Sequence, residues 1–455
     1  MTELLERQRP LARISRLPLL APLRARDYRL VWFGESISLL GDQFHYVALS
    51  WLVLGLTGSG LALGTVLLAA ALPRGVFLLL GGVLSDRVSP RALMLWSNLV
   101  RAVITTAIAA LVLGARVEIW HLVLAGAMFG TVDAVFFPAI GTIVARLVPE
   151  DQLAPANAML QGTQQLVSTV GPAVAGFTIA LIGVGAAFAI DAASFAIAAI
   201  AVWLVRGARG RSTAQEVEAP SLTPPLSPAA LVPADVDAMP GPAAPDPAVP
   251  NAATPAASML TSMIEGARAV MGDPVMRMLV LLSTAFNFAF NGPVVVGLPW
   301  LVQVRFAGDP AMLGLLFAAF GAGSLIGVVL AGTVRRTRSL GGLLIAVAIA
   351  LGVELGAIGL APAPVVGAIL FAIGIGLGYI NVSIISWAQA RAEPHLLGRT
   401  MSFLMLGSVV AAPLSLAIAG VAVDVNATAL FVAAGCLVVA TALAGWATGF
   451  QRGMV

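Results

Sequence analysis

Ionisable side chains inside long apolar segments are the residues of this chain most able to do chemistry. Five acids and two arginines lie in such segments: Glu35, Asp42, Asp133, Asp191, Glu354, Arg74 and Arg101. A charge at the centre of a bilayer costs about 2.5–3.5 kcal/mol on insertion scales, so each one suggests a partner and a role. The chemistry that they offer is reversible proton binding at a buried carboxyl group whose affinity a nearby arginine sets.

One polar stripe lies in the first long apolar segment. Glu35, Ser38, Asp42 and His45 recur at intervals of three or four residues, which places them on one face of a helix. Since a helix rises about 1.5 Å per residue, Asp42 and Arg74 lie at similar depths in the membrane. We predict that they form a buried ion pair, and two interpretations stay open: the pair only orients two helices, or it is a proton site.

The same estimate of depth predicts that Asp133 and Arg101 lie at the same level in the membrane. Asp133 is then either a residue that binds substrate or a proton, or a static partner that neutralises Arg101.

The elements that must position these groups are membrane spans. Of the 455 residues, 59% are hydrophobic and only 10% are charged, and the mean hydropathy is +0.97. This excludes an ordinary cytosolic enzyme, a disulfide scaffold and a nucleic-acid binder, and the single Cys436 cannot form an internal disulfide. Segments of about 20 apolar residues suffice to cross a bilayer. Twelve are predicted, over residues 29–55, 60–84, 92–115, 119–142, 158–182, 184–206, 276–304, 311–334, 340–361, 364–388, 400–422 and 427–450.

Arginine placement predicts the orientation. All 25 basic residues are arginine, and 21 of them lie on the side of the membrane that holds both termini, against two on the opposite side. Cytoplasmic loops carry the excess of positive charge, so residues 1–28 form a cytoplasmic arm and residues 451–455 a cytoplasmic tail.

A change of composition divides the chain into two halves. Residues 207–257 hold eleven prolines and fourteen alanines, a composition that cannot bury a core, so we predict a disordered cytoplasmic linker there. Residues 258–275 are expected to form an amphipathic segment on the cytoplasmic face. Six spans lie in residues 29–206 and six in residues 276–450.

The halves resemble each other. Trp51-Leu52-Val53 near the end of the first span is echoed by Trp300-Leu301-Val302 near the end of the seventh. Other pairs at an offset of about 250 residues are Gly64 with Gly314, Gly82 with Gly332, and Asp42 with Asn291. Two parallel six-helix repeats with a path along their pseudo-two-fold axis are the architecture of transporters that rock between two open states.

The loop between the second and third spans carries a family resemblance. Residues 82–91 resemble the loop of the major facilitator superfamily that runs Gly-x-x-x-Asp-Arg-x-Gly-Arg-Arg/Lys, and four residues match: Gly82, Asp86, Arg87 and Arg91. Ser89 and Pro90 replace a glycine and an arginine of the family's pattern, so an altered turn is expected.

The fifth span carries a second motif. Gly171, Pro172 and Gly176 resemble the core of the Gly-Pro-x-x-Gly-Gly motif of the superfamily's antiporters, with Ala175 in place of one glycine. A Gly-Pro pair in a membrane helix gives a smooth, bendable surface on which the opposite half can pack. The alternative is a kink with no bearing on the direction of transport.

Further stretches narrow the resemblance. Residues 26–32, 40–42, 56–59 and 147–158 are similar to the bacterial subgroup of macrolide-efflux and enterobactin-exporter proteins. In the superfamily's fold, spans 1, 4, 7 and 10 line the cavity, which favours Asp133 and leaves Asp191 and Glu354 as weaker coupling candidates. Residues suited to a large amphiphilic substrate in that cavity, or alternatively to bonding between helices, are Asn287, Asn291, Asn381, Trp387, Phe136 and Phe137.

The resemblance implies an all-α, twelve-helix transporter in a bacterial cytoplasmic membrane that exports drug-like small molecules by proton antiport. Its partners would be substrate, protons and the bilayer, with no nucleic acid, and it would act as a monomer. Alternatives are a siderophore, lipid or natural-product transporter, or a receptor on the same fold. Because the chain has no lysine, it cannot form a phosphate-binding loop, and its three histidines are too far apart in sequence to suggest a metal site, so we expect no enzyme and no cofactor.

Overall fold

The computed structural model describes residues 18–206, 272–333, 340–391 and 397–450, which form helices joined by short turns. Several predicted segments lie outside these residues: positions 1–17 of the N-terminal arm, the Pro/Ala-rich linker 207–257, most of the segment 258–275, and the tail 451–455.

The first half contains six helices of membrane length in its described residues, and each follows a predicted span to within a few residues. They are α2 (Arg26–Thr57), α3 (Gly60–Arg87), α4 (Pro90–Leu113), α5 (Ile119–Leu147), α6 (Leu153–Ile182) and α7 (Val184–Trp203). Two ends are fixed by glycine. Gly58 has φ 65° and Gly183 has φ 84°, conformations that a side chain disfavours, so α2 and α6 end there.

The second half follows the same plan with two irregular helices. Its seventh span of the chain consists of α9 (Pro274–Gly292), the π-helical turn η5 (Pro293–Gly297), α10 (Leu298–Trp300) and a second π-helical turn, η6 (Leu301–Arg305). It continues with α11 (Pro310–Thr333), α12 (Leu340–Ile358), α13 (Ala363–Arg391) and α14 (Leu397–Ala447).

The helix α14 is two spans in one element. Asn426 has extended backbone angles, φ −161° and ψ 100°, which interrupt the helix and separate two stretches that each suffice to cross a membrane. Eleven helices of the described residues are long and apolar enough to span a bilayer, with α14 counted once. The predicted twelve-helix, all-α membrane fold is confirmed.

A hydroxyl group explains why α9 stops being regular. Ser415 of α14 accepts a hydrogen bond of 2.7 Å from the Gly292 N–H and donates its own hydrogen to the Phe288 carbonyl oxygen. In a regular α-helix that N–H and that carbonyl would bond to each other. The hydroxyl therefore replaces one backbone hydrogen bond of the helix directly before Pro293, which has no N–H.

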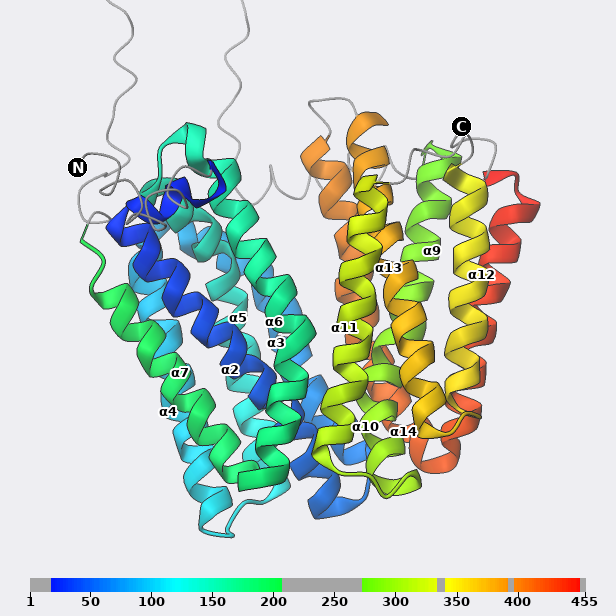
Figure 1. Cartoon of the computed structure of the whole chain (residues 1–455), viewed down its shortest axis with the longest axis horizontal. Coiled ribbons are helices and arrows are strands. Elements are labelled where there is room, and N and C mark those ends of the chain that lie inside the picture. Colours follow the sequence, from blue (N-terminus) through cyan, green and yellow to red (C-terminus); the bar gives the residue numbers. More distant parts are fainter. Residues whose placement is uncertain (1–17, 207–271, 334–339, 392–396, 451–455) are drawn as a thin grey trace, which may run out of the picture.

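The helices form two bundles with the same internal contacts. In the first, α3 packs on α5 and α4 on α7; in the second, α11 packs on α13 and α12 on α14. Figure 1 shows the two bundles side by side, with the start of α2 and the end of α14 at the same edge. The bundles converge at the opposite edge, where α3 meets α14 and α6 meets α11. We call this edge the closed mouth.

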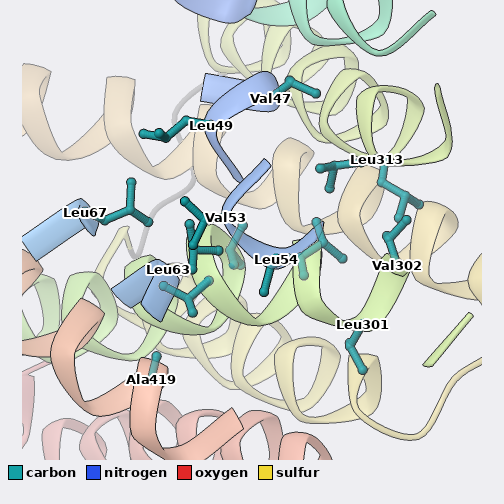
Figure 2. Packing of buried hydrophobic residues seen from close by; sticks show 14 of the residues in the cluster. Val47, Leu49, Val53, Leu54, Leu63, Leu67, Leu301, Val302, Leu313 and Ala419 are labelled. Carbon is teal, nitrogen blue, oxygen red and sulfur yellow. The ribbon is translucent and has the colours of Figure 1, made fainter. Parts of the chain in front are cut away.

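Apolar side chains from both halves seal the closed mouth. Figure 2 shows Val53 and Leu54 of α2 facing residues of the second half, among them Val302 of η6 and Leu313 of α11. Val53, Val302 and Leu313 are wholly buried. Val53 and Val302 are repeat partners, so equivalent positions of the two halves contribute to one seal.

Candidate functional site

A buried charge cluster lies inside the first half. Arg101 of α4 forms an ion pair with Asp133 of α5, as the depth of the two residues predicts. Arg101 is only 3% exposed, and its guanidinium group lies 4.3 Å from the centre of the Phe136 ring. The arginine is therefore held by a carboxylate and an aromatic face, and both interactions are strong away from water.

The prediction for Arg74 was wrong in its partner. We predicted Asp42 as the partner, but the acid that lies 3.8 Å from Arg74 is Asp133. The Arg74 side chain is 43% exposed. Depth along a helix fixes the level of a residue but leaves open the direction in which the side chain points, so an acid on a different helix at the same level took the place of Asp42.

The acids of the α2 stripe lie beside the Arg101–Asp133 pair. Asp42 is within electrostatic reach of Arg101, Asp133, Asp191 and Glu35. Glu35 is 4% exposed, and its Oε1 atom has no hydrogen-bond partner in the described residues. Four carboxyl groups therefore share one region of the first half.

His45, the last residue of the stripe, contacts an acid of α7. Its Nδ1 atom lies 3.0 Å from Oδ2 of Asp191, and the Asp191 side chain is fully buried. The stripe itself indicated that His45 shares a face with Glu35 and Asp42, but the partner on α7 had no signal in the sequence.

A cavity of about 610 Å³ lies in the second half, a size that suits a drug-like molecule. Residues of α9, α11, α12, α13 and α14 line it, together with Gln165 of α6 from the first half. Its polar groups are amides and hydroxyls, and its apolar wall includes Phe286, Phe290 and Phe320. Among the described residues, the lining holds no Asp, Glu, Arg or His.

Three asparagines predicted for a substrate cavity line this one: Asn287, Asn291 and Asn381. The amide nitrogen of Asn287 donates to the Ser283 carbonyl oxygen at 2.9 Å, and that of Asn291 donates to the Asn287 carbonyl oxygen, also at 2.9 Å. These bonds within α9 hold both side chains in place at the cavity wall.

Two of the aromatic residues predicted for the cavity, Phe136 and Trp387, are absent from its described lining. Phe136 is 5% exposed and contacts Arg101, so it belongs to the charge cluster. Trp387 packs against an apolar cluster that includes Leu279 and Leu344. The side chain of Phe137 lies outside the described residues.

The antiporter-type motif forms contacts on both of its sides. A Cβ atom on Gly171 would lie 2.5 Å from Gln43 of α2, so this glycine lets α6 approach a helix of its own half. A Cβ on Gly176 would lie 2.4 Å from the Pro310 carbonyl oxygen of α11, and one on Gly314 would lie 2.2 Å from the Pro172 carbonyl oxygen. The motif thus forms a smooth surface against the opposite half.

The repeat partner of Gly314 has an equivalent contact. A Cβ on Gly64 of α3 would lie 2.9 Å from the Leu416 carbonyl oxygen of α14. Both members of the Gly64 and Gly314 pair therefore bring a helix of one half against a helix of the other, which supports the repeat read from the sequence.

The loop motif is described in part. The surroundings of Gly82 and the side chains of Asp86 and Arg87 lie outside what the structure describes. Arg91 donates from Nε to the Val202 carbonyl oxygen at 3.1 Å, at the C-terminal end of α7, where a cation is favourable. The substituted residues have a local explanation, because Ser89 caps α4 through the Ala92 N–H and Pro90 is at the first position of that helix.

A polar contact joins the halves at the closed mouth. Asp424 of α14 accepts hydrogen bonds from the Ser59 hydroxyl at 2.7 Å, the Gly60 N–H at 2.6 Å and the Leu61 N–H at 3.0 Å. A carboxylate of the second half therefore caps the N-terminus of α3 in the first. We name this contact the Asp424 latch.

Asp424→Asn is expected to open the closed mouth. Losing a carboxylate at a helix N-terminus costs about 1 kcal/mol, which changes the ratio of closed to open molecules roughly five-fold. Spin labels would be placed on Arg116 and Leu360, which lie on loops of the two halves. A larger fraction of the molecules should then show a long distance between the two labels. The control is Asp309→Asn, because Asp309 caps its own helix through the Met312 N–H at 2.8 Å. An unchanged distance distribution in Asp424→Asn would refute the latch.

The chain has two halves that meet at one mouth, a cavity and buried charges. These features define a class of protein, the membrane transporters, which work without an enzymatic reaction. The chain belongs to the major facilitator superfamily, because the family model described as Major Facilitator Superfamily matches residues 31–416. The resemblance predicted from the loop 82–91 is confirmed.

Curated relatives include efflux proteins. Macrolide efflux protein A of Streptococcus pyogenes is 24% identical over 419 residues, which cover 91% of this chain and 93% of the relative. The multidrug efflux pump Tap of Mycolicibacterium fortuitum is 25% identical over 407 residues, covering 87% and 88%. The predicted resemblance to macrolide-efflux proteins is confirmed.

Solved structures of transporters share the fold. The nucleoside transporter NupG has a TM-score of 0.66 at 12% identity, with 93% of this chain and 99% of that chain covered. A D-xylose-proton symporter has a TM-score of 0.62 at 15% identity, covering 91% and 97%. At these identities the likeness concerns the fold alone.

Proposed function

We propose that the chain exports hydrophobic or amphiphilic small molecules of the drug or antibiotic kind in exchange for protons, by alternating access. It would do so in a bacterial cytoplasmic membrane, as a monomer with both termini in the cytoplasm. The arginine excess beside the termini supports this orientation, in which the closed mouth faces the outside and the cavity is reached from the cytoplasm.

One observation carries the proposal: a cavity whose described lining is uncharged in one half, and in the other a cluster of four carboxyl groups, of which Glu35 and Asp191 are buried. The cavity offers apolar walls, aromatic rings and amides, which suit an amphiphilic molecule of little charge. The cluster offers carboxyl groups that bind and release protons as water reaches them. Substrate and proton would thus bind in different halves, and the motion of one half on the other would couple them.

The relatives support the choice of substrate class. Two proteins that align with most of this chain have names that include macrolide efflux and multidrug efflux. The lining residues Asn287, Asn291 and Asn381 would orient such a molecule through its hydroxyl or carbonyl groups, and Phe286 and Phe320 would contact its apolar part.

The experiment is an accumulation assay in an efflux-deficient bacterial host. Cells producing the protein should accumulate less of at least one compound in a panel of macrolides and amphiphilic dyes than cells with an empty vector, and a protonophore should abolish the difference. An equal content of every compound in both strains would reject export of this substrate class. A difference that survives the protonophore would reject the proton as the driving ion.

A further inference from the structure

We propose that His45 and Asp191 form a second proton-binding site, which carries one proton in each transport cycle in addition to the proton handled near Arg101 and Asp133. The inference rests on the proposed proton antiport and extends it to a stoichiometry and to two further residues.

The pair is isolated from water. The Asp191 side chain is fully buried and that of His45 is 12% exposed, with 3.0 Å between Nδ1 and Oδ2. The other carboxyl oxygen, Oδ1 of Asp191, is buried without a hydrogen-bond partner in the described residues. The imidazole ring lies 4.7 Å from the ring of Phe129 and 5.4 Å from that of Phe188, measured between centres.

Such surroundings make the pair hold a proton. A buried carboxylate beside a neutral imidazole would be an uncompensated charge, which is far more costly than a matched pair. The pair is therefore stable either as carboxylate and imidazolium or as carboxylic acid and imidazole, and both forms carry one exchangeable proton. Water that reaches the pair would solvate the bare carboxylate and so let that proton leave.

The other charges of the region require two protons in total. Asp42 of α2 lies within electrostatic reach of Asp191, and also of Glu35 on α2, Arg101 on α4 and Asp133 on α5, while Arg74 of α3 contacts Asp133. With Asp191 there are four carboxyl groups and two guanidinium groups, so a neutral cluster holds two protons. Asp133 is matched by Arg101, and Arg74 is at the partly exposed rim. One proton then belongs to the His45–Asp191 pair and the second to Glu35 or Asp42.

A single helix links the pair to the closed mouth. A Cβ atom on Gly41 of α2 would lie 2.0 Å from Oγ of Ser194 and 2.7 Å from Oδ1 of Asp191, so the close approach of α2 to α7 seals the acid. Further along the same helix, Val53 and Leu54 contact the second half. A movement of α2 when the mouth opens would therefore change the contact that excludes water from Asp191.

The test is the substrate gradient that purified full-length protein sustains in proteoliposomes under a pH difference of one unit, with the membrane potential clamped at zero. Radiolabelled erythromycin is the probe. Two protons per substrate sustain a gradient of about 100-fold and one proton about ten-fold, since one pH unit is a factor of ten per proton. We expect about 100-fold for the wild type and about ten-fold for His45→Gln and Asp191→Asn.

The matched control is His121→Gln. His121 lies at the start of α5 and takes part in the capping box with Glu118, far from the cluster. It should keep the wild-type gradient. His45→Gln keeps a group that can donate to Asp191, so it decides the question even if Asp191→Asn does not fold.

The outcomes are distinct. A wild type that moves erythromycin by proton exchange while both variants sustain the wild-type gradient would overturn the second proton site and leave the proposed function intact. A wild-type protein that builds no erythromycin gradient under the pH difference, although cells producing it extrude erythromycin, would instead overturn the proposed proton antiport.

Discussion

Replacing Asp133 with asparagine is expected to abolish proton-driven export. The substitution removes the acid that pairs with both Arg101 and Arg74. It also removes one of the carboxyl groups that can exchange a proton. Everted membrane vesicles that contain the variant should take up no more substrate under an imposed pH gradient than vesicles without the protein.

A second variant separates the transport role from a structural one. Asp133→Asn leaves Arg101, at 3% exposure, without its paired charge, and breaking a buried pair in this way costs about 3–5 kcal/mol. The double variant Asp133→Asn with Arg101→Gln restores the charge balance, so its thermal unfolding temperature should return toward that of the wild type while transport stays absent. If the double variant also transports at the wild-type rate, the pair is a static brace and Asp133 has no part in coupling.

Replacing Gly314 with valine is expected to stop transport through a steric effect at the interface between the halves. The new Cβ would lie 2.2 Å from the Pro172 carbonyl oxygen, and backbone atoms on two packed helices cannot move aside at low cost. The halves could then no longer meet at the closed mouth, so spin labels on Arg116 and Leu360 should report a longer distance in all molecules.

The control for Gly314→Val lies in the same helix. Gly332 of α11 has open space where a Cβ atom would be placed, so Gly332→Val adds the same side chain without a clash. It should keep the wild-type distance distribution and transport. Wild-type export by Gly314→Val would contradict the role of the Pro172 and Gly314 contact in closing the mouth.

Much of the fold followed from local physics. Apolar length fixed the spans, and glycines such as Gly58 and Gly183 fixed where helices end. For this reason the predicted starts at residues 60 and 184 coincide with those of α3 and α7. Repeat partners also proved informative, since Gly64 and Gly314 have equivalent contacts between the halves.

The site was predictable only where helix depth or helix face was sufficient. Depth alone identified the Arg101 and Asp133 pair, and the family resemblance, which places span 7 at the cavity, identified the asparagines of α9 that line it. Depth failed for Arg74, because the direction of a side chain depends on how a helix is rotated about its axis. The prediction of Phe136 as a cavity residue failed for the same reason, since its ring faces Arg101.

Contacts between distant parts of the chain had no signal in the sequence. The Asp424 latch joins residues 364 positions apart, and Asp424 itself belongs to none of the stretches singled out in the sequence. The His45 and Asp191 contact crosses 146 positions. Both depend on the packing of helices that the sequence pattern leaves free to rotate, so only the three-dimensional arrangement identifies them.

The most direct test of the central claim is the exchange of substrate for protons by the purified protein. Proteoliposomes that contain a pH-sensitive dye and the full-length chain should show proton movement when a gradient of erythromycin is imposed, in the direction opposite to the drug. A protonophore should collapse drug accumulation, and liposomes with Asp133→Asn should show neither flux. Drug movement at the same rate with and without a pH gradient, and without proton movement, would contradict proton antiport.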